Sequence, residues 1–334
     1  MPDKPEKPLE PATQDERDAP SETAASKYRR KQLERQLGPT QFIDEPPPLT
    51  HDTLWRGLAR KGEARLLVVR ATEAAQEAAS RLNASGEVAK LVGELIVAAL
   101  LVRSTLNPDA RMQVYIRHDG PTGKMVADVW EGGGVRVYVK QPEATAELDG
   151  TLFGPGLMEV ARTHAATGKS WRSTVQLQGD RIEDFMMHYL LESEQVLSLL
   201  RVEVEVANGV VTSALGYLVQ LMPEGTHDDL KRMTQNLQTM TPLTEGMSHG
   251  DPDARAWAEL LMDGFRWDQC GREMVEYECR CSEARILQML STLPPADLQE
   301  MASDTNDVEI SCDFCRTKYL VKPSAIGELL EPPS

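Results

Sequence analysis

The chain has 334 residues, of which 41% are hydrophobic and 26% are charged. This length and composition suit two or three domains with a buried core and exclude a wholly disordered protein. The 52 acidic and 36 basic side chains give a formal net charge of −16, which disfavours nucleic-acid binding because phosphates need cationic partners. The longest strongly apolar run, residues 95–102, is far shorter than the roughly 20 residues of a membrane helix. No apolar signal segment follows Met1, so we expect a cytoplasmic protein without membrane or nucleic-acid partners.

Residues 1–50 differ in composition from the rest of the chain. They contain nine of the 21 prolines, including the run Pro46–Pro48, together with many charged side chains. Such a segment buries too little apolar surface to offset the entropy lost on ordering. We therefore predict a disordered tail over residues 1–50, and a short C-terminal tail over residues 323–334.

The segment from residue 51 to residue 224 is predicted to be the N-terminal domain. Runs that are typical of strands recur along it, at residues 66–69, 112–116, 125–130, 135–139 and 174–178. A hairpin is expected from residues 202–206 to residues 210–222, because Asn208-Gly209 is a strong signal for a type I′ turn.

Three helices are predicted within the same domain. Residues 72–82 are rich in alanine, and residues 87–104 are apolar on nearly every face, which indicates a helix buried on all sides. The third helix follows Asp180 and Glu183, whose spacing matches a capping box. Runs of strands with a few helices, rather than strict alternation, predict an α+β fold in which helices pack on a mixed or antiparallel sheet.

Residues 225–269 are predicted to form a helical linker. Apolar side chains between residues 230 and 240 recur at the spacing of one helix face. A second linker helix is expected to begin at Asp251-Pro252, an N-cap residue followed by a proline suited to the first helical position.

All five cysteines lie in the last fifth of the chain. Four of them form two close pairs, Cys279-x-Cys281 and Cys312-x₂-Cys315, while Cys270 stands apart. Close pairs in a cytosolic protein indicate a metal site rather than structural disulfides, and four thiolates satisfy the tetrahedral coordination of zinc. We predict one zinc ion per chain on the two pairs, and we interpret Cys270 as an incidental buried thiol.

Residues 270–322 are predicted to fold as a small zinc-binding module. Strands over residues 308–310 and 319–321 would place the second cysteine pair in a knuckle between them. Helices over residues 283–293 and 296–301 would bring the two pairs together. Four protein ligands leave no open position on the metal, which disfavours catalytic zinc. The chain contains no other catalytic motif, so we expect no enzyme.

The spacing of the first cysteine pair favours a redox switch over a purely structural metal site. The sulfurs of a C-x-C pair can oxidise to one another in a small, strained ring, and strained disulfides tend to be regulatory. The alternative is a constitutive zinc-ribbon adaptor that binds a partner protein or nucleic acid. Residues 270–321 contain ten acidic and five basic side chains, which disfavours phosphate binding by this module.

The cysteine pattern resembles that of the redox-regulated holdase chaperone family, the thirty-three-kilodalton heat-shock protein of bacteria. Further segments between residues 52 and 321 are similar to the same family: Gly62-Glu-Ala-Arg65, Ala71-Thr72, Leu91-Val-Gly93-Glu94-Leu95, Asp119-Gly120-Pro121-Thr-Gly123, Gly134-Val-Arg136-Val-Tyr138, Glu192-Ser193-Glu194-Gln195 and Gly216-Tyr-Leu-Val-Gln-Leu-Met-Pro223. Residues 1–50 and Cys270 have no counterpart in the pattern.

The resemblance implies an ATP-independent chaperone that is inactive while reduced, with zinc held by Cys279, Cys281, Cys312 and Cys315. Oxidation by hypochlorite, or by peroxide with heat, would expel the zinc and unfold the C-terminal part. The active form would be a homodimer that binds unfolding client proteins. Four cysteines allow three disulfide pairings. We expect Cys279–Cys281 and Cys312–Cys315, because the members of each pair are already adjacent in the sequence.

Overall fold

The computed structural model describes residues 51–107, 109–146, 151–238 and 254–330. The predicted tail over residues 1–50 and the expected helix start at Asp251-Pro252 lie outside the described residues. Within the described part of the chain, no helix is long and apolar enough to cross a membrane.

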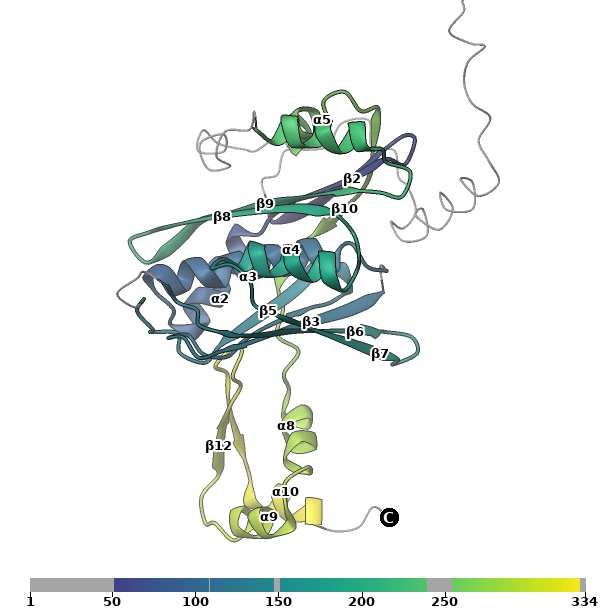
Figure 1. The fold of residues 1–334 in the computed structure, drawn as a ribbon. Helices are drawn as coiled ribbons and strands as arrows, with labels where there is room; N and C mark the ends of the chain where they lie inside the picture. Colours follow the sequence, from purple (N-terminus) through teal and green to yellow (C-terminus); the bar gives the residue numbers. More distant parts are fainter. Residues whose placement is uncertain (1–50, 108, 147–150, 239–253, 331–334) are drawn as a thin grey trace, which may run out of the picture.

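Two sheets with helices between them form the body of the molecule (Figure 1). The five-stranded sheet has, in spatial order, β10 (Trp267–Met274), β1 (Thr53–Ala59), β2 (Ala64–Arg70), β9 (Val210–Leu221) and β8 (Ser198–Ala207). The six-stranded sheet has β11 (Glu276–Tyr277), β5 (Gly134–Val139), β4 (Met125–Val129), β3 (Ala110–His118), β6 (Gly156–His164) and β7 (Ser170–Gln176). The described pairings are antiparallel, apart from that of β11 with β5.

The helical layer consists of α2 (Thr72–Leu82), α3 (Gly86–Arg103) and α4 (Ile182–Glu192). Helix α3 is buried along almost its whole length because it lies between the two sheets, which explains why its apolar residues follow no single face. The α+β architecture predicted from the sequence is confirmed. The type I′ hairpin is confirmed as well, since Asn208 has φ 53° and Gly209 has φ 77°.

Four strands, β1, β6, β10 and the two-residue β11, were not predicted. Strand β1 is buried on both faces: Leu54 belongs to the core between the sheets, while Trp55 faces a second core on the outer side. A strand of this kind shows no alternation of polar and apolar residues. Strand β10 is a largely polar edge strand that carries Cys270 and pairs with β1. Cys270 therefore lies in the five-stranded sheet, and not at the start of the zinc module as predicted.

The linker helices α5 (His227–Gln238) and α7 (Ala254–Leu261) cover the outer face of the five-stranded sheet. The second core lies between this face and the linker: it contains Trp55, Leu66, Val68, Tyr217 and Val219 from the sheet and Met233, Ala258, Leu261, Met262 and Phe265 from the linker region. The five-stranded sheet is thus packed on both faces, whereas each linker helix packs against the sheet through a single apolar face.

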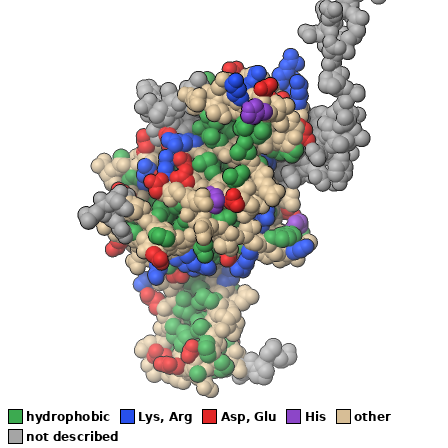
Figure 2. Space-filling view, viewed as in Figure 1, with side chains coloured by type: hydrophobic (Ala, Val, Ile, Leu, Met, Phe, Trp, Pro, Cys, Tyr) green, Lys and Arg blue, Asp and Glu red, His purple; other side chains and the backbone are tan. Residues whose placement is uncertain are grey.

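The C-terminal module projects from the six-stranded sheet (Figure 1). Its elements are α8 (Glu283–Leu290), α9 (Pro295–Ala302), β12 (Val308–Ser311), β13 (Lys318–Val321), α10 (Pro323–Gly327) and the 3₁₀ turn η3 (Glu328–Leu330). Hydrophobic side chains run along it (Figure 2). Its own core is small, and it includes Ile326, which is fully buried. Residues 323–330 therefore pack against the module, instead of forming the start of a tail as predicted.

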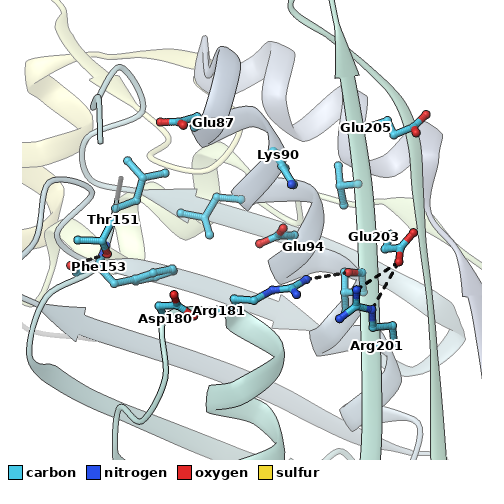
Figure 3. Close-up of a pocket in the computed structure, with 14 residues that line it drawn as sticks. Glu87, Lys90, Glu94, Thr151, Phe153, Asp180, Arg181, Arg201, Glu203 and Glu205 are labelled. Atoms are coloured by element: carbon cyan, nitrogen blue, oxygen red, sulfur yellow. Dashed lines mark hydrogen bonds and ion pairs between the residues drawn. The ribbon is translucent and has the colours of Figure 1, made fainter. Parts of the chain in front are cut away.

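The predicted capping box at Asp180 and Glu183 is absent. Helix α4 begins after Arg181, which has an extended backbone and makes no side-chain cap. The Glu183 carboxylate instead accepts a hydrogen bond from the Val202 backbone N–H at 2.9 Å and pairs with Arg181 and Arg201. Figure 3 shows the Arg181 side chain extending toward Arg201 on strand β8, whereas Asp180 lies nearer Phe153.

This difference predicts that substitutions of Glu183 and Asp180 change the free energy of unfolding by very different amounts. Glu183→Ala leaves a buried N–H without its acceptor and should lower the free energy of unfolding by about 2 kcal/mol. Asp180→Ala should change it by less than about 0.5 kcal/mol, because Asp180 is exposed. A true N-cap would lose about 1 kcal/mol instead. Urea unfolding measures the free energy of unfolding of both variants. A loss of about 1 kcal/mol or more in Asp180→Ala would show that Asp180 caps helix α4.

Candidate metal centre

The four paired cysteines come from two segments that the fold places side by side. Cys279 and Cys281 follow β11, and the Ser282 hydroxyl then caps helix α8 by accepting from the Arg285 N–H at 3.3 Å. Cys312 and Cys315 lie in the turn between β12 and β13. Backbone hydrogen bonds close this knuckle, from the Cys312 N–H to the Thr317 carbonyl and from the Arg316 N–H to the Cys312 carbonyl.

The sulfur atoms have the spacing of a tetrahedral metal site. All four lie within 4.8 Å of one another. Cys279 Sγ is 3.8 Å from Cys312 Sγ, and Cys281 Sγ is 3.4 Å from Cys315 Sγ. Four sulfurs at the usual zinc–sulfur distance of about 2.3 Å would lie about 3.8 Å apart. The structure therefore brings together all four predicted ligands as free thiols in an arrangement that could hold a metal ion.

Hydrogen bonds and charges around the sulfurs favour the thiolate form at Cys279, whereas burial raises the pKa of Cys281. The Tyr319 hydroxyl donates to Cys281 Sγ at 3.0 Å, and the Arg136 guanidinium donates to Cys279 Sγ at 3.4 Å. The hydrogen bond from Cys312, with help from Arg136, lowers the pKa of Cys279 to about 4. The same shared hydrogen bond, together with burial, raises the pKa of Cys312. A thiolate at Cys279 is thus stabilised even before a cation binds.

The site is attached to the body of the molecule through the residues that precede it. Strand β11 pairs in parallel with β5, and the Glu278 N–H donates to the Val135 carbonyl at 2.9 Å. The Tyr277 hydroxyl donates to the Phe314 carbonyl, inside the second cysteine pair, at 3.1 Å. The Arg81 guanidinium reaches the Cys315 carbonyl at 3.5 Å. The first cysteine pair therefore follows directly on the six-stranded sheet, and the turn that holds the second pair contacts both this sheet and helix α2.

Sequence reasoning missed the side chains around the sulfurs, namely Arg136, Tyr277 and Tyr319. One signal is present in the sequence, the glycine run from residue 132 to residue 134. Gly133 has φ 81°, and a side chain there would collide with the carbonyl of Met274. This close approach of two backbones brings the chain from β10 to β11 and so positions the first cysteine pair.

Cys270 takes no part in the cluster. Its side chain is buried in the sheet, and its thiol donates to the Asp268 carbonyl at 3.5 Å. A separate cavity of about 640 Å³ opens between α3 and β8 (Figure 3). The described residues that line it include no cysteine, serine or histidine, and charged groups there already interact, as in the Arg201–Glu203 pair at 3.4 Å. The cysteine cluster is the stronger candidate site.

Comparison with known proteins identifies the family of the chain. The family profile described as "Hsp33 protein" matches residues 52–322. The "33 kDa chaperonin" of Nostoc punctiforme is 32% identical over 292 residues, which cover 84% of this chain and 96% of that protein. The "33 kDa chaperonin" of Synechocystis sp. is 30% identical over 290 residues, with 84% and 96% coverage.

A crystal structure of the 33 kDa chaperonin (heat shock protein 33 homolog) from Thermotoga maritima shares the fold. It superimposes with a TM-score of 0.73 at 23% identity and covers 84% of this chain and 98% of that chain. The region that matches the family profile extends from just before β1 to just after β13, and it confirms the resemblance seen in the sequence. The chain belongs to the Hsp33 protein family.

Proposed function

We propose that this Hsp33-family chaperone is a redox-regulated, ATP-independent holdase of the cytoplasm, and that it has no enzymatic activity. In the reduced state Cys279, Cys281, Cys312 and Cys315 would hold one zinc ion, and the protein would be inactive. Oxidation would release the metal, unfold the C-terminal part and produce a homodimer that binds unfolding clients. The observation that carries this proposal is the convergence of four thiols within 4.8 Å in a module with a very small core.

The donor set supports zinc as the metal. Thiolates are soft ligands that suit zinc, and structural zinc sites are usually tetrahedral with four protein ligands. Bound there, zinc would supply a cross-link between the segment after β11 and the knuckle between β12 and β13. Tyr319 and Arg136 would hold the sulfurs in place from outside, through the hydrogen bonds to Cys281 and Cys279.

The size of the module supports unfolding after metal loss. Its fully packed core consists of five side chains: Ile286, Leu290, Leu298, Val321 and Ile326. A core of this size gives marginal stability at best. A structural zinc site contributes on the order of 10–16 kcal/mol of apparent binding free energy, comparable to the roughly 5–15 kcal/mol by which whole domains are stable. Without the metal, the module should unfold rather than loosen.

The linker provides apolar surface that such unfolding could uncover. The chain runs from Phe265, in the core beneath the linker, through β10 and β11 directly into Cys279. Disorder that spreads back along this path would detach β10 from β1 and loosen α5 and α7. The outer face of the five-stranded sheet, with Trp55 and Tyr217, would then be available to clients.

The oxidation itself needs only an oxidant of the peroxide class. Four thiolates lose four electrons and form two disulfides, which leaves no thiolate to hold Zn²⁺. Two peroxide molecules accept the four electrons and four protons and leave as four water molecules. We propose the pairs Cys279–Cys281 and Cys312–Cys315. Because all four sulfurs lie within 4.8 Å, distance alone permits the other pairings.

The first test concerns the metal. Reduced protein should contain about one zinc per chain, and oxidation with peroxide should release it. Cys312→Ser should reduce the zinc content several-fold, because it removes a ligand that is also buried. Cys270→Ser is the matched control and should keep the full zinc content. Metal analysis after gel filtration measures both; zinc-free reduced protein, or zinc retained after all four thiols are oxidised, would contradict the proposal.

The second test maps the disulfides. Trypsin cleaves after Arg280 and Arg285 but finds no site between Cys312 and Cys315. The proposed pairing predicts peptide 273–280 linked to peptide 281–285, while peptide 286–316 carries an internal disulfide. Any link from peptide 286–316 to either of the other two, seen by mass spectrometry without reduction, would overturn it.

The third test concerns activity and unfolding together. Oxidised protein should suppress the aggregation of a heat-denaturing client, and reduced protein should not. Proteolysis should open residues 225–321 only after oxidation, while residues 52–224 stay protected by their larger, cysteine-free core. Sedimentation should show a dimer in the oxidised sample. If residues 225–321 were equally protected in both states, a constitutive zinc-ribbon adaptor would be the better description.

A further inference from the structure

The contact between the six-stranded sheet and the cysteine knuckle centres on one side chain, Arg136. Along β5, Val135, Val137 and Val139 point into the core between the sheets. Arg136 and Tyr138 therefore point to the opposite face. The module joins the body beneath this sheet (Figure 1), and Figure 2 shows Lys and Arg side chains gathered at the junction.

Arg136 joins the two sides of this junction through four contacts. On the sheet side it forms an ion pair with Asp128 at 3.0 Å and lies over the Trp130 ring at 5.2 Å. On the module side it lies 3.9 Å from the centre of the Phe314 ring and donates to Cys279 Sγ at 3.4 Å. Phe314 lies between Cys312 and Cys315, so Arg136 contacts the first cysteine pair directly and the turn that holds the second pair through Phe314.

The Arg136 guanidinium has one anionic partner on each side of the junction while the sulfurs are thiolates: Asp128 and Cys279. Asp128 is completely buried, and Arg136 shares it with a second guanidinium group, that of Arg111. The neighbouring Arg280 has acidic partners of its own, Glu131 and Glu278. Four thiolates around one Zn²⁺ carry a net charge of about −2. Two disulfides carry none. Oxidation would therefore leave the largely buried Arg136 with only the carboxylate that it shares with Arg111, which is unfavourable.

We propose that Arg136 is a charge sensor that holds the cysteine module on the six-stranded sheet while its sulfurs are anionic. Neutralisation of the sulfurs by disulfide formation removes this attraction and releases the module from the sheet. Arg136 acts as a positioning residue here, because it contacts the ligands from outside and would not coordinate the metal. The inference rests on the proposed function, since it takes zinc-bound thiolates and disulfides as the two states.

Arg111 provides a matched control. It pairs with Asp128 at 2.6 Å and lies 5.6 Å from the centre of the Trp130 ring, as Arg136 does at similar distances. No described contact joins Arg111 to the module. Loss of Arg111 should therefore disturb the same carboxylate and ring without weakening the attachment of the knuckle.

The test measures hydrogen exchange by mass spectrometry in the reduced, zinc-loaded full chain. Amides of residues 276–278 and 312–316 should exchange about tenfold or more faster in Arg136→Gln, because a charge-assisted hydrogen bond is lost. Arg136→Lys keeps the charge and should lie between wild type and Arg136→Gln. Arg111→Gln should match wild type at these amides. Zinc content should stay near one per chain in every variant, and after oxidation all variants should exchange equally fast.

Several results would overturn the inference. Equal exchange in Arg136→Lys and Arg136→Gln would show that charge is irrelevant, and an equal effect of Arg111→Gln would indicate a general loss of sheet stability. Unchanged exchange in Arg136→Gln, or loss of zinc from it, would remove the sensor role. The proposed function would fail differently, through wild-type protein that binds no zinc or that stays inactive when oxidised.

Discussion

The C-terminal module depends on one constraint: its four paired thiols lie within 4.8 Å of one another. Anionic sulfurs at this spacing repel each other strongly unless a cation lies among them, and neutral thiols would leave the site without a cross-link. Two outcomes both relieve the repulsion and cross-link the site: binding of a metal ion, or oxidation to disulfides. These two outcomes differ in geometry and in charge, so the same four residues can specify two different states of the chain.

The segment from β10 to Cys279 connects the cysteine cluster to the rest of the molecule. It begins as the edge strand beside β1, passes the Gly133 backbone in close contact, pairs with β5 as β11 and then supplies the first two sulfurs. One stretch of backbone therefore links both sheets to the cysteine cluster. The linker helices directly precede this segment, so their packing on the outer face of the five-stranded sheet is sensitive to whether β10 and β11 stay ordered.

Sequence reasoning identified the elements whose patterns are local. The four cysteines, the buried helix α3 and the Asn208-Gly209 turn were all predicted, because spacing or composition within a short window determines each of them. Strands β1 and β10 escaped prediction because a strand covered on both faces and a polar edge strand lack alternation. Asp180 and Glu183 had the spacing of a capping box, but a buried N–H on β8 competed successfully for the carboxylate. The role of Arg136 could not be assigned, since its partners in the module, Cys279 and Phe314, lie far away in the sequence.

The four clustered cysteines lie at the edge of the fold, outside the large core between the sheets. The module that would unfold in the proposed switch is therefore separate from the N-terminal domain that would stay folded. The large core between the sheets contains no cysteine and does not require the metal. The module has only a small core of its own, and the linker shares its core with the sheet. Stability therefore decreases along the chain from the N-terminal domain toward the metal site. In the proposed switch, a perturbation at the sulfurs would act on the least stable part first, and the most stable part would remain to present the apolar face that the linker covers.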